Sequence, residues 1–308
     1  MSLIPVPKDL IFKSPDSHDP RLGELVQFTV PHQLQSNSFC LIGYPDDEGI
    51  RLNGGRAGAK DAPHLIRQFL FKMTPDILKK EIPRLFDVGN LQPQSSLEKT
   101  HALALDYTKQ IMEKSTLLSL GGGHDFGFPD AAAFLESNKD KNPLILNFDA
   151  HLDVRPTNRG FHSGTPFRRL IEKYHGKFEL VEIGIQPQCN SQAHLEWATE
   201  KGIKVIFIDE IQRKGLRHVL SDGLKPDPQR PLWISLDIDA FSSNEAPGCS
   251  QSWATGLNIQ EFLPALEWLC QSYSCRGMGI YEVSPPLDED NRTSKLAALI
   301  LHRFMSFK

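Results

Sequence analysis

Three polar residues at alternate positions, directly after a short apolar run, constrain this chain most. The run, residues 144–148, is typical of a buried strand, and Asp149, His151 and Asp153 follow it. If the strand continues through them, the three side chains point to one side, because side chains alternate along a strand. Polar groups gathered at a buried strand end need hydrogen bonds, ion pairs or a metal ion. This stretch alone is equally compatible with a metal site and with a solvated strand end that caps the next segment.

A second apolar run favours the metal site. Residues 231–236 lead into Asp237 and Asp239, which are again two positions apart. A third run, residues 116–120, ends in three glycines followed by His124. In an open parallel sheet the C-terminal ends of the strands share one edge, where ligand sites form. We therefore expect six metal ligands to converge there: His124, Asp149, His151, Asp153, Asp237 and Asp239.

The chemistry of these ligands predicts which ions they hold. Four aspartates carry about four negative charges at neutral pH, which balances two divalent cations. Oxygen and imidazole ligands without a thiolate suit Mn²⁺ better than a structural Zn²⁺. Two such ions lower the pKa of a water molecule held between them. The residues thus indicate metal-assisted hydrolysis with two Mn²⁺ per subunit.

Composition argues against several other classes of protein. The 308 residues are 40% hydrophobic and 23% charged, and the net charge of −4 argues against a nucleic-acid-binding surface. Five cysteines without a CxxC spacing indicate reduced thiols rather than a disulfide framework or a zinc ribbon. The first residues lack a signal-peptide pattern, and no long apolar run occurs. We expect a cytoplasmic protein that acts on a small molecule, without a membrane or nucleic-acid partner.

Strand and helix patterns alternate along most of the chain, which indicates an α/β fold. Residues 1–37 contain several prolines without clear periodicity, and we expect an irregular N-terminal arm there. Residues 38–308 are expected to form a single catalytic domain, since no linker or repeat interrupts them. A mostly parallel sheet with helices on both faces follows from the alternation. Its eight strands are expected at residues 39–44, 84–88, 116–120, 144–148, 179–185, 203–208, 232–238 and 278–283.

Loops after these strands carry residues suited to substrate binding or proton transfer. The guanidinium of Arg155 could hold a substrate carboxylate, or pair with one of the aspartates. His162 is a candidate for proton transfer, because histidine titrates near neutral pH, although an ordinary loop histidine has the same pattern. Gln186 and Asn190 supply neutral hydrogen-bonding groups for substrate at the same edge. Glu282 ends the last strand, where it could accept hydrogen bonds from a cationic amidine or guanidine.

Together these motifs resemble those of the ureohydrolases, the superfamily of arginases and agmatinases. The resemblance rests on GGGHD at 121–125, DAHLD at 149–153, SLDIDAF at 235–241 and the segment around Glu282. It runs from about residue 39 to the C-terminus. It implies a three-layer fold around an eight-stranded parallel sheet, a binuclear Mn²⁺ centre on the six ligands above, hydrolysis of a carbon–nitrogen bond and a homo-oligomer. By the same resemblance, Glu282 orients the amidinium of the substrate.

The variable loops are most similar to those of the formimidoylglutamase branch of this superfamily. The resemblance implies hydrolysis of N-formimidoyl-L-glutamate to L-glutamate and formamide in histidine degradation. Arginases typically have asparagine where Arg155 stands, and a cationic fork suits a substrate with two carboxylates. The position that carries a histidine directly before a glycine in arginases falls on His162 or Ser163, and Ser284 replaces the usual asparagine.

Two alternatives to this function stay open at the level of sequence. One is another ureohydrolase that releases urea, such as a guanidinobutyrase, an agmatinase or an arginase-like enzyme. The other is a non-catalytic paralogue that acts as a scaffold. The presence of all six ligand positions argues against a scaffold, since a protein without activity is expected to lose at least one of them.

Overall fold

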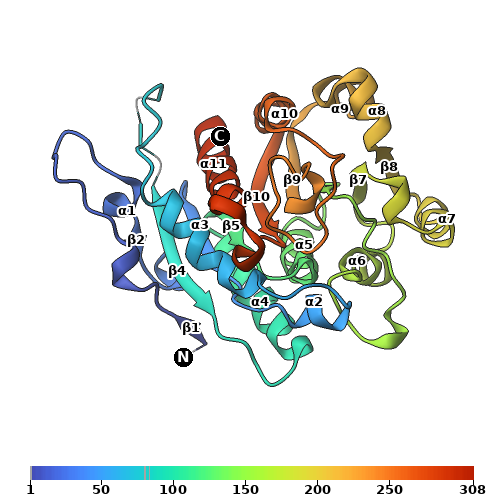
Figure 1. Cartoon of the computed structure of the whole chain (residues 1–308), viewed down its shortest axis with the longest axis horizontal. Helices are drawn as coiled ribbons and strands as arrows, with labels where there is room; N and C mark the ends of the chain where they lie inside the picture. Colours follow the sequence, from blue (N-terminus) through green and yellow to red (C-terminus); the bar gives the residue numbers. More distant parts are fainter. Residues whose placement is uncertain (1, 80, 83) are drawn as a thin grey trace.

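All eight strands expected from the apolar runs are present in the computed structural model, which describes residues 2–79, 81–82 and 84–308. They pair in parallel within one sheet (Figure 1). Most are buried on both faces, which explains why their sequences are nearly continuous apolar runs. The strands are β3 (Phe39–Gly43), β4 (Leu85–Leu91), β5 (Thr116–Leu120), β6 (Leu144–Phe148), β7 (Glu179–Ile185), β8 (Lys204–Phe207), β9 (Asp227–Asp237) and β10 (Tyr273–Tyr281).

The N-terminal segment contributes to the sheet, so the sheet has ten strands instead of the expected eight. β1 (Leu3–Ile4) pairs antiparallel with β4, and β2 (Gln27–Phe28) pairs parallel with it. The segment also contains one short helix, α1 (Leu22–Leu25), and is otherwise mostly irregular. Two-residue strands give no periodic signal, which is why the sequence pattern did not predict them.

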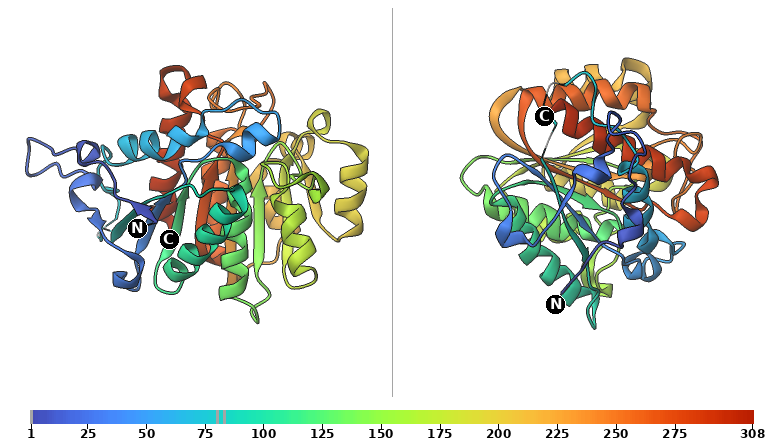
Figure 2. Two further views of the ribbon diagram at one scale, coloured as in Figure 1. Left: turned by 90° about the horizontal axis from the view of Figure 1, so that it is seen from below. Right: turned by 90° about the vertical axis from the view of Figure 1, so that its left-hand side faces the viewer.

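Helices cover both faces of the sheet, as the alternating pattern predicts (Figures 1 and 2). The sheet separates two apolar cores. Side chains of β6 alternate between them: Leu144 and Leu146 belong to one core, and Ile145 belongs to the other. The first core includes α3 (Ala62–Leu70), α8 (Ile208–Lys214), α9 (Leu216–Gly223), α10 (Ile259–Ser272) and α11 (Arg292–Phe307). The second includes α4 (Leu97–Met112), α5 (Gly127–Ser137), α6 (Pro166–Tyr174) and α7 (Gln192–Glu200). None of the described helices is long and apolar enough to span a bilayer.

The order of the strands positions the candidate site. β5, β10, β9 and β6 are neighbours in that order at the centre of the sheet, although they are far apart in sequence. Each of the four is followed, or ended, by residues that the sequence analysis selected. Loops at the C-terminal ends of neighbouring parallel strands meet at one edge, so the topology brings these residues together. The short helix α2 (Glu48–Leu52), which follows β3, lies beside the same loops.

Candidate metal centre and active site

His124 lies at the centre of a group of carboxylates. It follows β5 after a glycine turn in which Gly122 has φ of 106°, a conformation that favours glycine. Its Nδ1 lies 3.0 Å from Asp149 Oδ2, 3.1 Å from Asp153 Oδ2 and 3.2 Å from Asp237 Oδ2. The three sequence motifs therefore meet at one buried nitrogen.

A second group of ligand atoms shares Asp149 with the first. Nδ1 of His151 lies 3.0 Å from Asp239 Oδ2 and 3.5 Å from Asp149 Oδ1. The atoms of each group lie close enough together to hold one ion. The two groups are His124, Asp149 and Asp237, and Asp149, His151 and Asp239. All six expected ligands thus gather at two adjoining positions.

This convergence comes from loop geometry, and the expectation that strand alternation produces it is wrong. β6 ends at Phe148, before the first ligand, and Asp153 has φ of 49°, which no strand residue adopts. Asp237 ends β9, but Asp239 lies on a 3-10 turn, where its backbone N–H donates to Asp237 Oδ1 at 2.9 Å. Backbone hydrogen bonds to the carboxylates themselves therefore set the directions of these side chains.

The charges of the group fit divalent cations. Nδ1 of His124 makes no hydrogen bond within the described residues, although three carboxylate oxygens surround it, and Ser235 Oγ lies 2.9 Å from Nε2. Burial, together with the charge of Asp239, raises the pKa of Asp237 well above its usual range. An ionised Asp237 is therefore unfavourable here unless positive charge lies beside it. Two divalent cations would neutralise the four aspartates, so this donor set fits a pair of metal ions.

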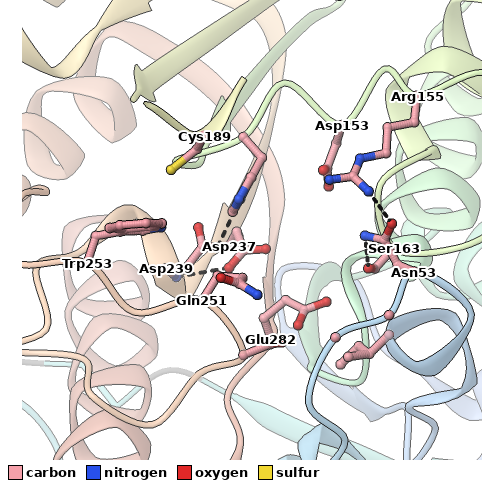
Figure 3. A pocket seen from close by; sticks show the side chains of 15 residues that line it. Asn53, Asp153, Arg155, Ser163, Cys189, Asp237, Asp239, Gln251, Trp253 and Glu282 are labelled. Atoms are coloured by element: carbon pink, nitrogen blue, oxygen red, sulfur yellow. Dashed lines mark hydrogen bonds and ion pairs between the residues drawn. The ribbon is translucent and has the colours of Figure 1, made fainter. Parts of the chain in front are cut away.

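A cavity of about 270 Å³ opens over these ligands (Figure 3). Arg155 and Trp253 lie on opposite sides of it. Arg155 Nη1 donates to Asn53 Oδ1 at 2.7 Å, and Asn53 Nδ2 donates to Ser163 Oγ at 3.0 Å. No aspartate or glutamate of the described chain pairs with Arg155, so its guanidinium keeps donors for a ligand. Trp253 was not selected from the sequence, because it stands in a loop without a recognisable motif.

Glu282 lies at the floor of this cavity (Figure 3). It directly follows β10 and has φ of 64°, so the chain turns sharply there. The backbone N–H of His124 donates to Glu282 Oε1 at 2.9 Å. Burial raises the pKa of Glu282 to about 8, and the charge of Asp239 adds to this effect. A cationic group in the cavity would favour the ionised carboxylate.

The two candidates for proton transfer lie in different places. Ser163 lines the cavity over the ligands, whereas His162 lines only an adjoining outer chamber. Nδ1 of His162 accepts a hydrogen bond from the Gly164 N–H at 3.2 Å. Burial lowers the pKa of His162, and the nearby charge of Arg155 lowers it further. His162 is therefore held neutral with its proton on Nε2.

Gln186 and Asn190, the neutral groups expected to bind substrate, make hydrogen bonds to two different loops of the chain. Gln186 lines neither cavity, and its side chain both donates to and accepts from Thr255, at 3.0 and 2.7 Å. Asn190 lines the outer chamber, but its Oδ1 accepts from the Leu152 N–H at 2.8 Å and its Nδ2 donates to Ala150 O at 2.9 Å. The sequence pattern placed both residues at this edge of the sheet, but it did not predict their hydrogen-bond partners.

A buried network behind His124 was missed in the sequence. His101 Nε2 lies 2.7 Å from Asp125 Oδ2, and Arg169 Nη1 lies 2.9 Å from His101 Nδ1. Because arginine only donates, Nδ1 of His101 is the acceptor and its Nε2 carries the proton given to Asp125. Asp125 directly follows His124, so the network fixes the turn that carries this ligand. His101 recurs with the buried residues of α4, so its spacing does not reveal these polar partners.

Comparisons with known proteins agree with this site. Residues 37–306 match the Arginase family. The formimidoylglutamase of Streptococcus gordonii is 31% identical over 275 residues, which cover 86% of this chain and 83% of that protein. A crystal structure of Trypanosoma cruzi formiminoglutamase with Mn²⁺ superposes with a TM-score of 0.82 and 28% identity, covering 93% of this chain and 97% of that one. For the formimidoylglutamase of Bacillus subtilis the TM-score is 0.85 and the identity 26%, with 96% and 94% covered. The family match spans nearly all of the sheet and both ligand groups, and on this evidence the chain belongs to the arginase family.

Proposed function

We propose that this protein is a manganese-dependent hydrolase that converts N-formimidoyl-L-glutamate and water to L-glutamate and formamide. One observation carries the choice of substrate: Arg155, without a carboxylate partner in the described chain, faces a cavity whose floor is the group of metal ligands. A cationic formimidoyl group suits the acidic floor, and a carboxylate suits the guanidinium. The names of the relatives and of the structural neighbours support the same substrate.

The metal ligands supply the basis of the reaction. His124, Asp149, Asp153 and Asp237 would hold one Mn²⁺, while His151 and Asp239 would hold the second together with Asp149. When bound, the two ions supply Lewis-acid chemistry that makes water nucleophilic near neutral pH. Ser163 lines the same cavity and is not one of these proposed metal ligands.

The remaining residues bind the substrate and handle protons. Glu282 Oε1 is occupied by the His124 N–H, which leaves Oε2 to accept a hydrogen bond from the amidinium. Arg155 holds a carboxylate at the opposite end of the substrate. His162 lies in the adjoining chamber and is the candidate for proton transfer to the amine that leaves.

We also propose a setting for this activity. The reaction would serve histidine degradation in the cytoplasm, in agreement with the five cysteines, none of which forms a disulfide in the described chain. A homo-oligomer is expected by resemblance to the family.

The test is an assay of the Mn²⁺-loaded protein on four substrates in parallel: N-formimidoyl-L-glutamate, L-arginine, agmatine and 4-guanidinobutyrate. Formamide, glutamate and urea are quantified separately. Formamide and glutamate in equal amounts from the first substrate alone support the proposal. Urea from any of the other three would retain the hydrolytic class and overturn the substrate. Absence of product from all four would favour a non-catalytic protein.

A further inference from the structure

An outer chamber of about 630 Å³ adjoins the cavity over the metal ligands. The two share part of their walls, including His151, Asp153 and Arg155. Beyond this shared wall, the chamber is lined by residues that the metal cavity does not contact. Among them are Arg159, His162 and His194.

The formal charge on the outer part of this chamber is positive. Arg159 has no hydrogen bond or ion pair within the described residues and is exposed. Apart from the metal ligand Asp153, no carboxylate lines the chamber. Burial lowers the pKa of His194, and the charge of Arg155 lowers it further, so this imidazole is a neutral hydrogen-bonding group. Arg155 and Arg159 are thus two guanidiniums without a carboxylate partner that face one chamber.

A neighbouring arginine shows what a satisfied guanidinium looks like in this region. Arg168 Nε donates to Glu172 Oε1 at 2.7 Å, and its guanidinium carbon lies 3.9 Å from the ring centre of Trp197. Arg168 lines neither cavity. The absence of such partners at Arg159 is therefore not general among the arginines of this part of the described chain.

The two arginines lie at different depths. Arg155 lines both the metal cavity and the outer chamber, whereas Arg159 lines only the chamber. Along the path from the ligands outward, the charges therefore run from the negative floor to one guanidinium and then to a second. This order matches a molecule with a cation at one end and two anionic groups at increasing distance from it.

N-formimidoyl-L-glutamate has this order of charges. Its α-carboxylate is attached to the carbon that bears the formimidoyl nitrogen, and its side-chain carboxylate lies two methylene groups farther away. We propose that Arg155 binds the α-carboxylate and that Arg159, in the outer chamber, binds the side-chain carboxylate and selects for it. This inference rests on the proposed function and assigns to Arg159 a specificity role at the same site.

The test compares two substrates of equal size, N-formimidoyl-L-glutamate and N-formimidoyl-L-glutamine, in which a neutral amide replaces the side-chain carboxylate. The wild-type protein is expected to show a higher kcat/KM for the glutamate derivative. Arg159→Gln is expected to reduce this preference about five- to tenfold, the effect of losing a charge-assisted contact at a partly exposed site. The change should occur in KM for the glutamate derivative, with kcat and both constants for the glutamine derivative nearly unchanged.

Arg84→Gln serves as the matched control, because it removes the same charge from an exposed arginine beside β4, outside both cavities. An unchanged preference in Arg159→Gln would overturn the inference, as would an equal loss in Arg84→Gln. If the wild-type protein hydrolyses both derivatives equally well, the proposed reaction class is supported, but the proposed specificity role of Arg159 is wrong. If it hydrolyses neither, the proposed function fails first. Calorimetric titration of the Mn²⁺-loaded variants with L-glutamate and L-glutamine then tests the chamber without turnover, and equal affinities for the two ligands would overturn it.

Discussion

At the scale of single residues, Asp149 is the ligand that the two groups share. Its two oxygens lie beside different histidines, His124 and His151, so it belongs to both ligand groups. Asp149→Asn removes one negative charge from both groups at once. We expect Mn²⁺ to fall well below two per chain and activity to fall by more than the roughly 10- to 100-fold that loss of an outer-shell partner costs.

Metal content by atomic absorption and turnover of N-formimidoyl-L-glutamate check this prediction together. Asp106→Asn, an exposed position on α4, is the control and should retain both. A fully metal-loaded Asp149→Asn protein would show that the shared ligand is misassigned.

A substitution of Arg155 tests the proposed contact with the substrate carboxylate that lies nearest to the metal ligands. Arg155→Ala should raise KM for N-formimidoyl-L-glutamate about tenfold and leave kcat within about twofold, because the contact is made equally in the ground state and the transition state. Steady-state kinetics of the purified variant measure both constants. Unchanged KM would show that this guanidinium does not hold the substrate.

At the scale of elements, a buried carboxylate joins three segments near the site. Asp130 on α5 accepts hydrogen bonds from Tyr44 Oη at 2.5 Å, just after β3, and from Tyr281 Oη at 2.6 Å, at the end of β10. Burial raises the pKa of Asp130 from 3.8 to about 6. Between these two pH values the folded protein binds this proton and the unfolded chain releases it.

A pH dependence of stability follows from this difference. The free-energy contribution of Asp130 to folding is largest below pH 3.8 and declines by about 3 kcal/mol as the pH rises through 6. Asp130→Asn lacks this dependence. The difference in unfolding free energy between wild type and Asp130→Asn, measured by urea denaturation from pH 3.5 to 7, should therefore decrease as pH rises. Parallel profiles would contradict this account.

The network behind His124 connects α4 with α6. His101 lies between Asp125 and Arg169, and its removal leaves both charges buried without their shared partner. We expect His101→Ala to lower the free energy of unfolding by about 3 kcal/mol and to weaken Mn²⁺ binding through movement of the turn. His218→Ala on α9, which is exposed, should change stability by less than about 0.5 kcal/mol. Equal stability of the two variants in urea would show that the network contributes nothing.

At the scale of the whole molecule, the sequence predicted most of the architecture because the strands are buried on both faces. Runs such as residues 39–43 and 144–148 are mostly apolar, and turns bound them clearly. The α/β class and the parallel sheet are confirmed. The segment between β8 and β9 forms two helices, because Gly215 with φ of 84° separates α8 from α9.

The site was less predictable beyond its motifs. The spacing of the aspartates and histidines identified the residues that the structure brings together, but the reason was wrong, because loops and not strands orient them. Gln186 was expected to reach the substrate but lines neither cavity, whereas Trp253 was not expected in the site but lines the cavity over the ligands. Nothing local to Gln186 reveals that Thr255, 69 residues away, occupies its amide, and nothing local to Trp253 reveals that it faces Arg155 across a cavity. Such contacts are set by the packing of distant loops.

The central claim is that two divalent cations, held by six ligands, support hydrolysis of a formimidoyl group. The most direct measurement is a titration of the metal-free protein with Mn²⁺, with bound metal and formamide release from N-formimidoyl-L-glutamate followed in the same samples. We predict that formamide release rises with bound metal and reaches its plateau at two Mn²⁺ per chain. Full activity without added metal, or a plateau at one ion per chain, would contradict the account.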